Sequence, residues 1–479
     1  MSFGRLAKFK INGFSGFNSI NIKMSHLKIG DKVAPVPIIQ GGMGVGISLS
    51  GLASAVANAG GIGIIAANAI GMLEPDYYTN GLEANKRALR KEIRKARKLS
   101  DGIIGVNIMV ALNDFHDLLQ VSIEEKADLV ILGAGLPLKG IPVQDLKEAG
   151  VKVVPIVSSA RAAALIFRYW QKSYGTVPDA VVVEGPKAGG HLGFKEDQID
   201  DPNYALENIV PGVIAEIAVY EKQTGKSIPV IPAGGIYTGE DIYKYFKMGA
   251  GGVQMATRFV ATDECDADIK FKETYINCKE DDIMIIKSPV GMPGRAIKNS
   301  FLEKLNSGKR EKNRCPWRCL NHCDIKTAQY CISQALDSAR QGKMETGYAF
   351  AGSNAFRVES IVPVKSLVQQ LKTEYLERVE KGTLDLRTEF EEALKKLTVL
   401  KDEYVRTARK SVESFKSDVE EVLEKGHAAF QKECGNVMKK MDKLKVEYAH
   451  HFDKVHELKE QLSRFLDTSF LKLPTPVLA

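Results

Sequence analysis

Short apolar runs recur along the first half of the chain, and each ends in glycine or a polar residue. They lie at residues 35–42, 61–67, 105–110, 128–135, 152–158, 180–185, 229–235 and 252–259. The runs do not alternate apolar and polar positions, which is typical of parallel strands that are covered on both faces. Segments with a helical pattern separate them. Eight strands alternating with helices predict an α/β fold, a closed (β/α)8 TIM barrel.

The pattern changes in the last hundred residues. From residue 372 to about 465 there is no proline, and charged residues are frequent. Apolar residues from Phe390 to Val422 recur at steps of three or four, which predicts a helix with a narrow apolar seam. Gly426 is a weak point, after which the seam continues. We therefore predict a barrel domain at 1–371 and a charged, coiled-coil-like helical tail at 372–479.

The apolar seam of the tail needs a partner helix. One candidate is the tail's own second half, folded back as a hairpin. The other is another subunit, either in a homo-oligomer or as a partner helix of a different protein. Because the barrel already has its eight strands, we expect no chemistry from the tail.

Charge and composition restrict the partners. The net charge of +7 is mild for 479 residues, and the one strongly basic segment, 84–98, is typical of a solvated helix face, so we expect no nucleic acid. Residues 33–73 carry no charge, but nine glycines and two prolines interrupt them, whereas a membrane span needs about 20 continuous apolar residues. An odd number of cysteines and no apolar leader in residues 1–17 indicate a cytoplasmic protein with thiols and no membrane.

Polar residues stand at the carboxyl ends of the predicted strands, where barrels of this kind carry their chemistry. They are Gln40, Asn107, Ser158, Glu184 and Thr257. His191 follows in "VVVEGPKAGGHLGF", directly behind two glycines. A lone histidine in a glycine-rich turn is often an ordinary loop residue. At a strand end it is also a titratable group that a flat ligand can approach, because glycine leaves the backbone uncovered.

Two glycine-rich turns follow the last two strands. "AGGIYTGEDI" begins at residue 233, and "GAGGVQMATRF" begins at residue 249. Free N–H groups at a tight glycine turn or a helix N-terminus bind anions. The loops after strands seven and eight are where barrels commonly hold a phosphate. The two turns together favour a phosphate site over ordinary tight turns.

Six motifs in this order resemble the nitronate monooxygenase family, formerly called 2-nitropropane dioxygenases. They are "PIIQGGMGVG", "GVNIMV", "EGPKAGGHLG", "PVIPAGGI", "GVQMATRFV" and "GMPGRAIKN", and the resemblance covers roughly residues 33–371. The flavin-dependent enoyl-acyl-carrier-protein reductases share the same barrel and many of these motifs. The resemblance therefore implies an FMN enzyme of one of these two branches.

The resemblance also implies which residues hold FMN. Those around the isoalloxazine ring would be Gln40, Gly41, Gly42, Met43, Asn107, Glu184 and Gly189. Those at the phosphate would be Gly234, Gly235, Gln254, Met255, Ala256 and Thr257. His191 matches the family's active-site histidine, which takes a proton from an acidic carbon or steadies an anionic substrate. The family usually has glycine where this chain has Ala256, so a methyl group stands at the phosphate turn.

Three functions remain open on this basis. In the first, a small alkyl nitronate is oxidised to a carbonyl compound and nitrite, with oxygen and no nicotinamide. In the second, NAD(P)H reduces FMN, which passes hydride to an enoyl thioester. In the third, the protein binds flavin without turnover. Because "MGVGISLSGLASAVA" and "SPVGMPGRAIKN" are closer to the monooxygenase branch, we predict a nitronate monooxygenase.

Four cysteines cluster late in the barrel domain, in the segment 315–331. They are Cys315, Cys319, Cys323 and Cys331. Such a group of thiols suits an iron–sulfur cluster or a zinc site, although the spacing matches no ferredoxin or zinc-finger pattern. The alternative is that the first three lie along one helix face as small buried hydrophobes. The other cysteines are isolated, and we interpret them as structural.

Overall fold

The computed structural model describes residues 24–311, 315, 318–321, 323–425 and 427–463. The segment 1–17, whose sequence has no apolar leader pattern, lies outside these residues. The chain divides into two compact units, one of which ends at Tyr375 while the other includes everything from Leu376 on.

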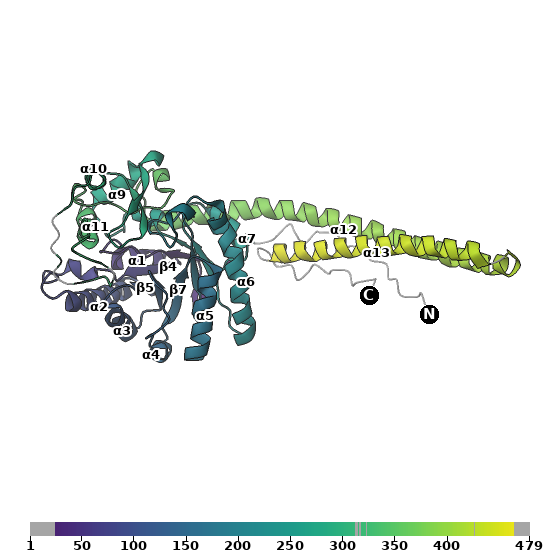
Figure 1. The fold of residues 1–479 in the computed structure, drawn as a ribbon, viewed down its shortest axis with the longest axis horizontal. Helices are drawn as coiled ribbons and strands as arrows, with labels where there is room; N and C mark the ends of the chain where they lie inside the picture. Colours follow the sequence, from purple (N-terminus) through teal and green to yellow (C-terminus); the bar gives the residue numbers. More distant parts are fainter. Residues whose placement is uncertain (1–23, 312–314, 316–317, 322, 426, 464–479) are drawn as a thin grey trace. The chain divides into compact units, whose positions relative to one another are not determined.

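In the described part of the first unit, eight parallel strands close into a barrel (Figure 1). In chain order they are β3 (Ile38–Gln40), β4 (Ile62–Ala66), β5 (Ile103–Met109), β6 (Leu129–Gly133), β7 (Lys152–Val157), β8 (Val181–Glu184), β10 (Val230–Ala233) and β11 (Val253–Met255). Strand β11 closes the barrel against β3, with Met255 beside Gln40. Each predicted run overlaps one of these strands, and β5 begins two residues before its run, so the TIM-barrel prediction is confirmed.

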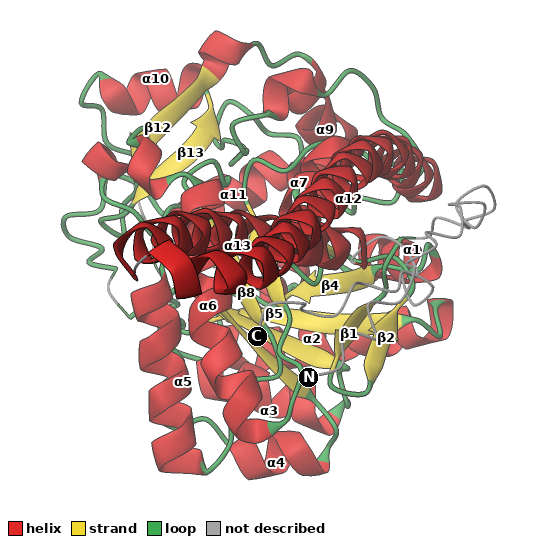
Figure 2. Ribbon diagram, turned by 90° about the vertical axis from the view of Figure 1, so that its right-hand side faces the viewer, coloured by secondary structure: helices red, strands yellow, loops and turns green. Residues whose placement is uncertain are grey.

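Helices follow the strands and cover the outside of the barrel (Figure 2). They are α1 (Ser50–Asn58), α2 (Gly81–Leu99), α3 (Phe115–Glu124), α4 (Val143–Glu148), α5 (Ala160–Tyr174), α6 (Leu206–Thr224), α7 (Gly239–Lys247) and α8 (Thr257–Val260). Single 3-10 turns occur at η2 (Ile70–Leu73), η3 (Glu196–Gln198), η4 (Pro202–Tyr204), η5 (Glu280–Asp282) and η6 (Ala355–Arg357).

The barrel is closed at the end where its strands begin. A hairpin of β1 (Leu27–Ile29) and β2 (Lys32–Ala34) packs its buried side chains against the apolar barrel interior. An added Cβ at Gly252, just before β11, would meet Leu27 at 2.9 Å, which shows how close the hairpin lies. The amino end is therefore filled, and the open end is the one with the polar residues.

The basic helix α2 is paired with acidic neighbours. Arg90 and Arg94 both contact Glu125, at 2.9 and 2.7 Å, and Arg97 contacts Asp128 at 2.7 Å. These contacts agree with a solvated, ion-paired helix face. Among the described helices, none is both long enough and apolar enough to cross a bilayer.

An insertion between α8 and the last long helices adds a second layer over the open end. Its elements are α9 (Ile269–Ile276), β12 (Ile283–Lys287), β13 (Pro293–Ile297), α10 (Ser300–Asn306) and α11 (Ile332–Arg340). Strand β13 pairs with β12 on one side and on the other with β9 (Gly190–His191). The segment that carries His191 is therefore a strand of the insertion's sheet, which the sequence did not indicate.

The second unit contains a helical hairpin. Helix α12 (Val364–Lys425) begins in the first unit, and α13 (His427–Ser463) lies beside it in Figures 1 and 2. Lys440 of α13 contacts Glu403 of α12 at 3.6 Å. Buried seam residues come from both helices, and they include Phe390, Leu397, Leu444 and Tyr448. Within the described residues, the second half of the tail thus packs on part of the predicted seam.

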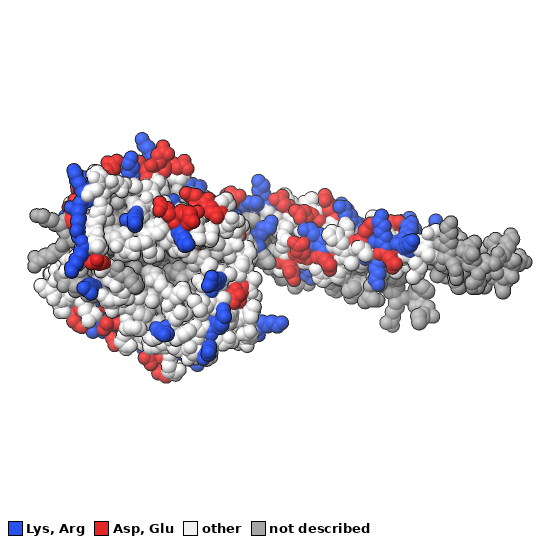
Figure 3. All heavy atoms as spheres, in the orientation of Figure 1, with Lys and Arg blue, Asp and Glu red and all other residues white. Residues whose placement is uncertain are grey.

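Charges of both signs are interspersed on the visible surface of this hairpin (Figure 3). The side chains at 411–434, which include later seam positions, lie outside what the structure describes. Coiled-coil packing and assembly with other subunits therefore stay predictions.

The predicted domain boundary at residue 371 falls inside α12. Two residues just beyond it belong to the barrel unit: Glu374 accepts a hydrogen bond from the Gly239 N–H at 2.7 Å, and the buried ring of Tyr375 meets that of Phe246 at 5.6 Å. The compact barrel unit ends at Tyr375. That the two units fold independently stays a prediction.

Candidate active site

A cavity of about 690 Å³ opens at the carboxyl ends of the barrel strands. Every predicted cofactor residue except Gln40 lines it, and His191 lines it as well. The lining set from the prediction is Gly41, Gly42, Met43, Asn107, Glu184, Gly189, Gly234, Gly235, Gln254, Met255, Ala256 and Thr257. Residues more than 200 positions apart thus meet around one space, because the strand ends of a closed barrel converge.

Gln40 lies behind the cavity wall. Its side chain is fully buried, and its Oε1 accepts a hydrogen bond from the backbone N–H of Ile64 at 3.0 Å. It therefore joins β3 to β4 within the barrel.

Gly41 and Gly42 line the cavity directly after β3, and the space beside Gly42 admits no side chain. A Cβ added at Gly42 would stand 2.5 Å from the Cβ of Asn107, so any side chain there would displace the asparagine. Asn107 is held by a hydrogen bond from its Nδ2 to the Ile131 carbonyl at 3.1 Å. The methyl of Ala256 faces Gly41, and its φ of −121° is one that alanine adopts freely. The departure from the family pattern at Ala256 thus causes no backbone strain.

The turn after β10 requires glycine. Gly234 and Gly235 have φ of +93° and +83°, and a Cβ at Gly234 would lie 2.9 Å from the Ala188 nitrogen. Nearby, the buried Oε1 of Gln254 has no hydrogen-bond partner among the described residues. A glycine cradle and an unsatisfied buried polar atom at one cavity wall are what a bound polar cofactor would complete.

Residues that follow the insertion's helix α11 bind both glycine-rich segments, the turn after β10 and the segment after β11. The backbone N–H of Gly352 donates to Thr257 Oγ1 at 3.2 Å, and Asn354 Nδ2 donates to the Gly235 carbonyl at 2.7 Å. Sequence reasoning missed both residues, because nothing local in their segment marks them and they lie about a hundred positions away.

His191 is oriented by the insertion. Its Nε2 lies 2.7 Å from Ser288 Oγ, and its ring meets the edge of Phe350 at 5.2 Å between centroids. Burial lowers the pKa of His191 to about 4. The imidazole is therefore neutral at physiological pH, with one ring nitrogen that accepts a proton.

The pKa of Glu184, at the end of β8, is shifted in the opposite direction from that of His191. Burial raises the pKa of Glu184 to about 7. Between these two residues, the loop is fixed by Arg295, whose guanidinium donates to the Pro186 carbonyl at 2.8 Å and to the Ala188 carbonyl at 3.3 Å. One cavity thus holds a carboxyl group with a raised pKa and an imidazole with a lowered pKa. Such a combination is typical of functional sites.

Ser288, Met292 and Phe350 are further site residues from the insertion that the sequence did not single out. Met292 and Phe350 line the cavity, and Ser288 touches His191 from behind. The quoted motif "SPVGMPGRAIKN" contains the first two. The available signal was thus a motif whose position against His191 only the sheet of β9 and β13 reveals.

The four clustered cysteines line a second, smaller pocket of about 230 Å³. The described residues from Cys315 to Cys331 form loop and turn, and α11 starts only at Ile332, so the alternative that the first three cysteines share a helix face is wrong. Burial raises the pKa of Cys319 to about 11, and the other three cysteines act in the same direction. Among the described side chains, no three potential ligands are arranged around a single metal ion. Cys265 and Cys278 are buried in the apolar core, as expected for structural cysteines.

The closed barrel with this cavity at the carboxyl ends of its strands defines the class of protein: a TIM-barrel protein with a small-molecule site. The sequence model of the nitronate monooxygenase family matches residues 27–374. The chain therefore belongs to the nitronate monooxygenase family and is a flavin-dependent oxidoreductase.

Curated relatives match the barrel. One relative is a Mycobacterium tuberculosis protein named as the dehydrogenase of a hydroxy-methyl-oxo-octahydro-indene carboxyl-CoA. It is 30% identical over 276 residues, which are 58% of this chain and 67% of the relative. A protein of Staphylococcus saprophyticus described as a "probable nitronate monooxygenase" is 28% identical over 297 residues, 56% of this chain and 78% of the relative.

Solved structures share the fold. FabK from Thermotoga maritima is 30% identical with a TM-score of 0.55, covering 72% of this chain and 94% of its own. A nitroalkane oxidase from Streptomyces ansochromogenes is 23% identical with a TM-score of 0.56, covering 72% and 97%. The second likeness, at its lower identity, supports the fold alone.

Proposed function

We propose that this protein binds FMN in the cavity and oxidises small alkyl nitronates to a carbonyl compound and nitrite, with dioxygen as the oxidant. The observation that carries the proposal is the position of His191: a neutral, buried imidazole at the wall of a glycine-lined cavity. Membership of the nitronate monooxygenase family supports the same reaction.

The residues present fit FMN. The cavity volume is in the range of small-molecule sites, about 300–1,000 Å³. The turn at Gly234 and Gly235 and the segment from Gln254 to Thr257 would hold the phosphate, where backbone N–H groups are available. Gly41, Gly42 and Asn107 would lie along the ring. Bound there, FMN would accept the electrons that the substrate loses.

His191 would act on the substrate, whereas the glycine turns would bind the phosphate of FMN. A neutral imidazole can take a proton from the acidic carbon of a nitroalkane or donate a hydrogen bond to the nitronate oxygens. Its contact with Ser288 holds the ring in one orientation. The insertion layer over the open end, which contributes Phe350 and Met292, would exclude water from the reacting carbon.

A second candidate is an NAD(P)H-dependent reduction of an enoyl thioester. What favours it is the identity of 30% to FabK, a flavin-dependent enoyl-acyl-carrier-protein reductase, together with the relative named for a carboxyl-CoA substrate. The two candidates share the barrel and the flavin and differ in the electron donor.

Anaerobic mixing of the purified flavin-loaded protein separates the candidates. Rapid bleaching of the flavin absorbance by ethylnitronate, with slow or no bleaching by NADH and NADPH, is the result we expect. Rapid bleaching by a nicotinamide and none by the nitronate would replace the proposal with the reductase. Acid-released flavin should be identified as FMN in both cases, and FAD would contradict the cofactor assignment.

A further inference from the structure

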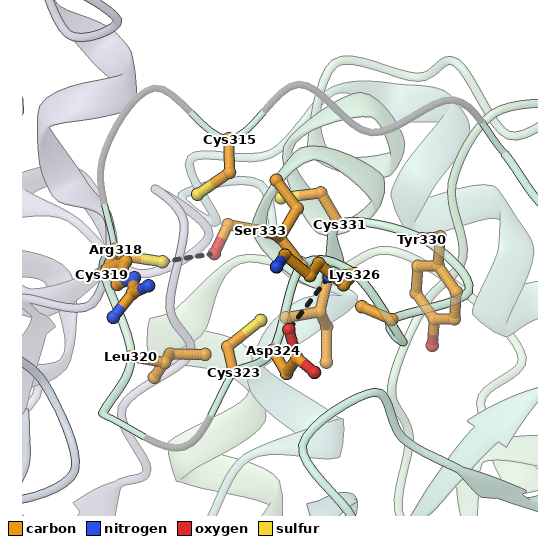
Figure 4. A pocket seen from close by; sticks show the side chains of 13 residues that line it. Cys315, Arg318, Cys319, Leu320, Cys323, Asp324, Lys326, Tyr330, Cys331 and Ser333 are labelled. Atoms are coloured by element: carbon orange, nitrogen blue, oxygen red, sulfur yellow. Dashed lines mark hydrogen bonds between the residues drawn. The ribbon is translucent and has the colours of Figure 1, made fainter.

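The second pocket is lined by four cysteines together with other residues. Figure 4 shows the four cysteine side chains around one space, with the thiols of Cys319, Cys323 and Cys331 turned into it. Asp324 lines the same pocket, as do the basic residues Arg318 and Lys326. Nothing in the proposed nitronate reaction uses these thiols.

Backbone hydrogen bonds join the cysteine segment to the barrel. The Asn113 N–H donates to the Cys319 carbonyl at 3.1 Å, and the Asn321 N–H donates to the Ala111 carbonyl at 3.0 Å. These backbone bonds fasten the cysteine segment to the loop that follows β5. The position of Cys319 is thereby fixed by the polypeptide itself.

The fourth cysteine adjoins a helix terminus. Cys331 directly precedes α11, and Ile332 and Ser333 at the start of that nine-residue helix also line the pocket. The positive end of a helix dipole favours negative charge nearby. An anionic group bound by thiolates would be stabilised there, with Arg318 and Lys326 adding positive charge.

This pocket shares a wall with the cavity of the active site. Leu320, Ile332 and Ser333 line both. The Cys319 Sγ lies 3.7 Å from the Ser333 Oγ. One layer of side chains therefore separates the cysteines from the proposed flavin site.

We propose that Cys315, Cys319, Cys323 and Cys331 bind an iron–sulfur cluster of the [4Fe–4S] kind. In such a cluster each thiolate binds its own iron, so the four sulfurs surround a sizeable core. A zinc ion instead draws four ligands to about 2.3 Å and leaves no space between them. The pocket that the four cysteines line together with other residues has a volume of about 230 Å³, which leaves room for such a cluster.

The position of the cluster indicates its role. It would pass single electrons between a one-electron carrier protein at the surface and the redox group in the cavity. For each transfer the carrier is oxidised by one electron and the group in the cavity is reduced by one, with no bond made or broken at the cysteines. Only this role rests on the proposed flavin function; the binding of the cluster does not.

The test uses the full-length chain, purified and reconstituted without oxygen with ferrous iron and sulfide. We expect about four iron and four sulfide per chain, and an electron paramagnetic resonance signal of a reduced cluster after dithionite. Cys319→Ser and Cys323→Ser should lose most of the iron. Cys278→Ser is the matched control, because Cys278 lies in the apolar core away from this pocket, and it should keep the iron of the wild type.

Flavin content, measured in the same samples, separates the two proposals: a variant that loses iron and keeps flavin isolates the cysteine site. Wild-type protein that retains zinc without sulfide, or no metal at all, would overturn the cluster. Equal iron in Cys319→Ser and wild type would also overturn it, because the iron would then lie elsewhere. If the serine variants precipitate, iron, sulfide and the resonance signal of the wild type decide the question alone.

Discussion

At the scale of single residues, the cavity holds two titratable groups that burial has shifted apart. The pKa of Glu184 is raised to about 7 and that of His191 is lowered to about 4. Near neutral pH the imidazole is uncharged, and the carboxyl is close to half ionised. Of these two groups, Glu184 is therefore the one that changes its charge around pH 7.

This assignment predicts how turnover depends on pH. Above about pH 7, Glu184 becomes negative, so an anionic nitronate should bind less well, and kcat/KM should fall as pH rises through that value. His191 is neutral throughout this range and adds no inflection. Glu184→Gln should give a flat kcat/KM from pH 6 to 8. The same inflection in the glutamine variant would assign it to another group.

A second residue-scale prediction concerns the turn at Gly234. Gly234→Ala should lose FMN, because the new Cβ would meet the Ala188 nitrogen and shift the turn. Gly225→Ala is the matched control: its φ of +68° imposes similar strain, but an added Cβ meets nothing within 4 Å. Both variants should lose about 1–2 kcal/mol of stability, and flavin content after gel filtration should distinguish them. Equal flavin in both would contradict a phosphate grip here.

At the scale of elements, the sequence predicts the repeated barrel strands but does not indicate the small sheet of the insertion. The barrel strands were evident because each is a continuous apolar run, such as 128–135. The sheet of β12, β13 and β9 was missed, because β9 has two residues and pairs with a strand about a hundred positions later. The cavity residues on barrel strands were predicted, whereas Ser288 and Asn354 depend on that non-local sheet and the loop behind it.

Ser288 tests whether the insertion positions His191. Ser288→Ala removes one hydrogen bond of about 0.5–1.5 kcal/mol, so kcat should fall about two- to tenfold while FMN content stays unchanged. A smaller change in KM than in kcat would mark a role in orienting the imidazole. Ser307→Ala, at an exposed helix end, is the control. Unchanged kcat in Ser288→Ala would show that Phe350 packing alone orients the ring.

At the scale of the whole molecule, the chain joins a catalytic barrel to a helical hairpin. Residues that complete the barrel unit extend to Tyr375, so a chain that stops at Leu371 loses the Glu374 and Tyr375 contacts. A chain that stops at Lys381 keeps them with about one and a half further turns of helix.

We predict that the chain ending at Lys381 is folded, binds flavin and is active, whereas the one ending at Leu371 has a lower melting temperature. Thermal melts, flavin content and kcat/KM for ethylnitronate check this, and gel filtration reports any change in assembly. Loss of flavin from the longer version would show that the barrel depends on the hairpin.

The most direct test of the central claim, that His191 acts on a nitronate in a flavin cavity, is the kcat/KM of His191→Ala. It should be measured at matched FMN occupancy with ethylnitronate and oxygen. We predict that this variant keeps its flavin, because the phosphate turns lie elsewhere. Its kcat/KM for ethylnitronate should fall about 10- to 100-fold, because the hydrogen bond of the imidazole to the charged nitronate is lost. An unchanged kcat/KM in the flavin-loaded variant would contradict this prediction and remove His191 from the mechanism.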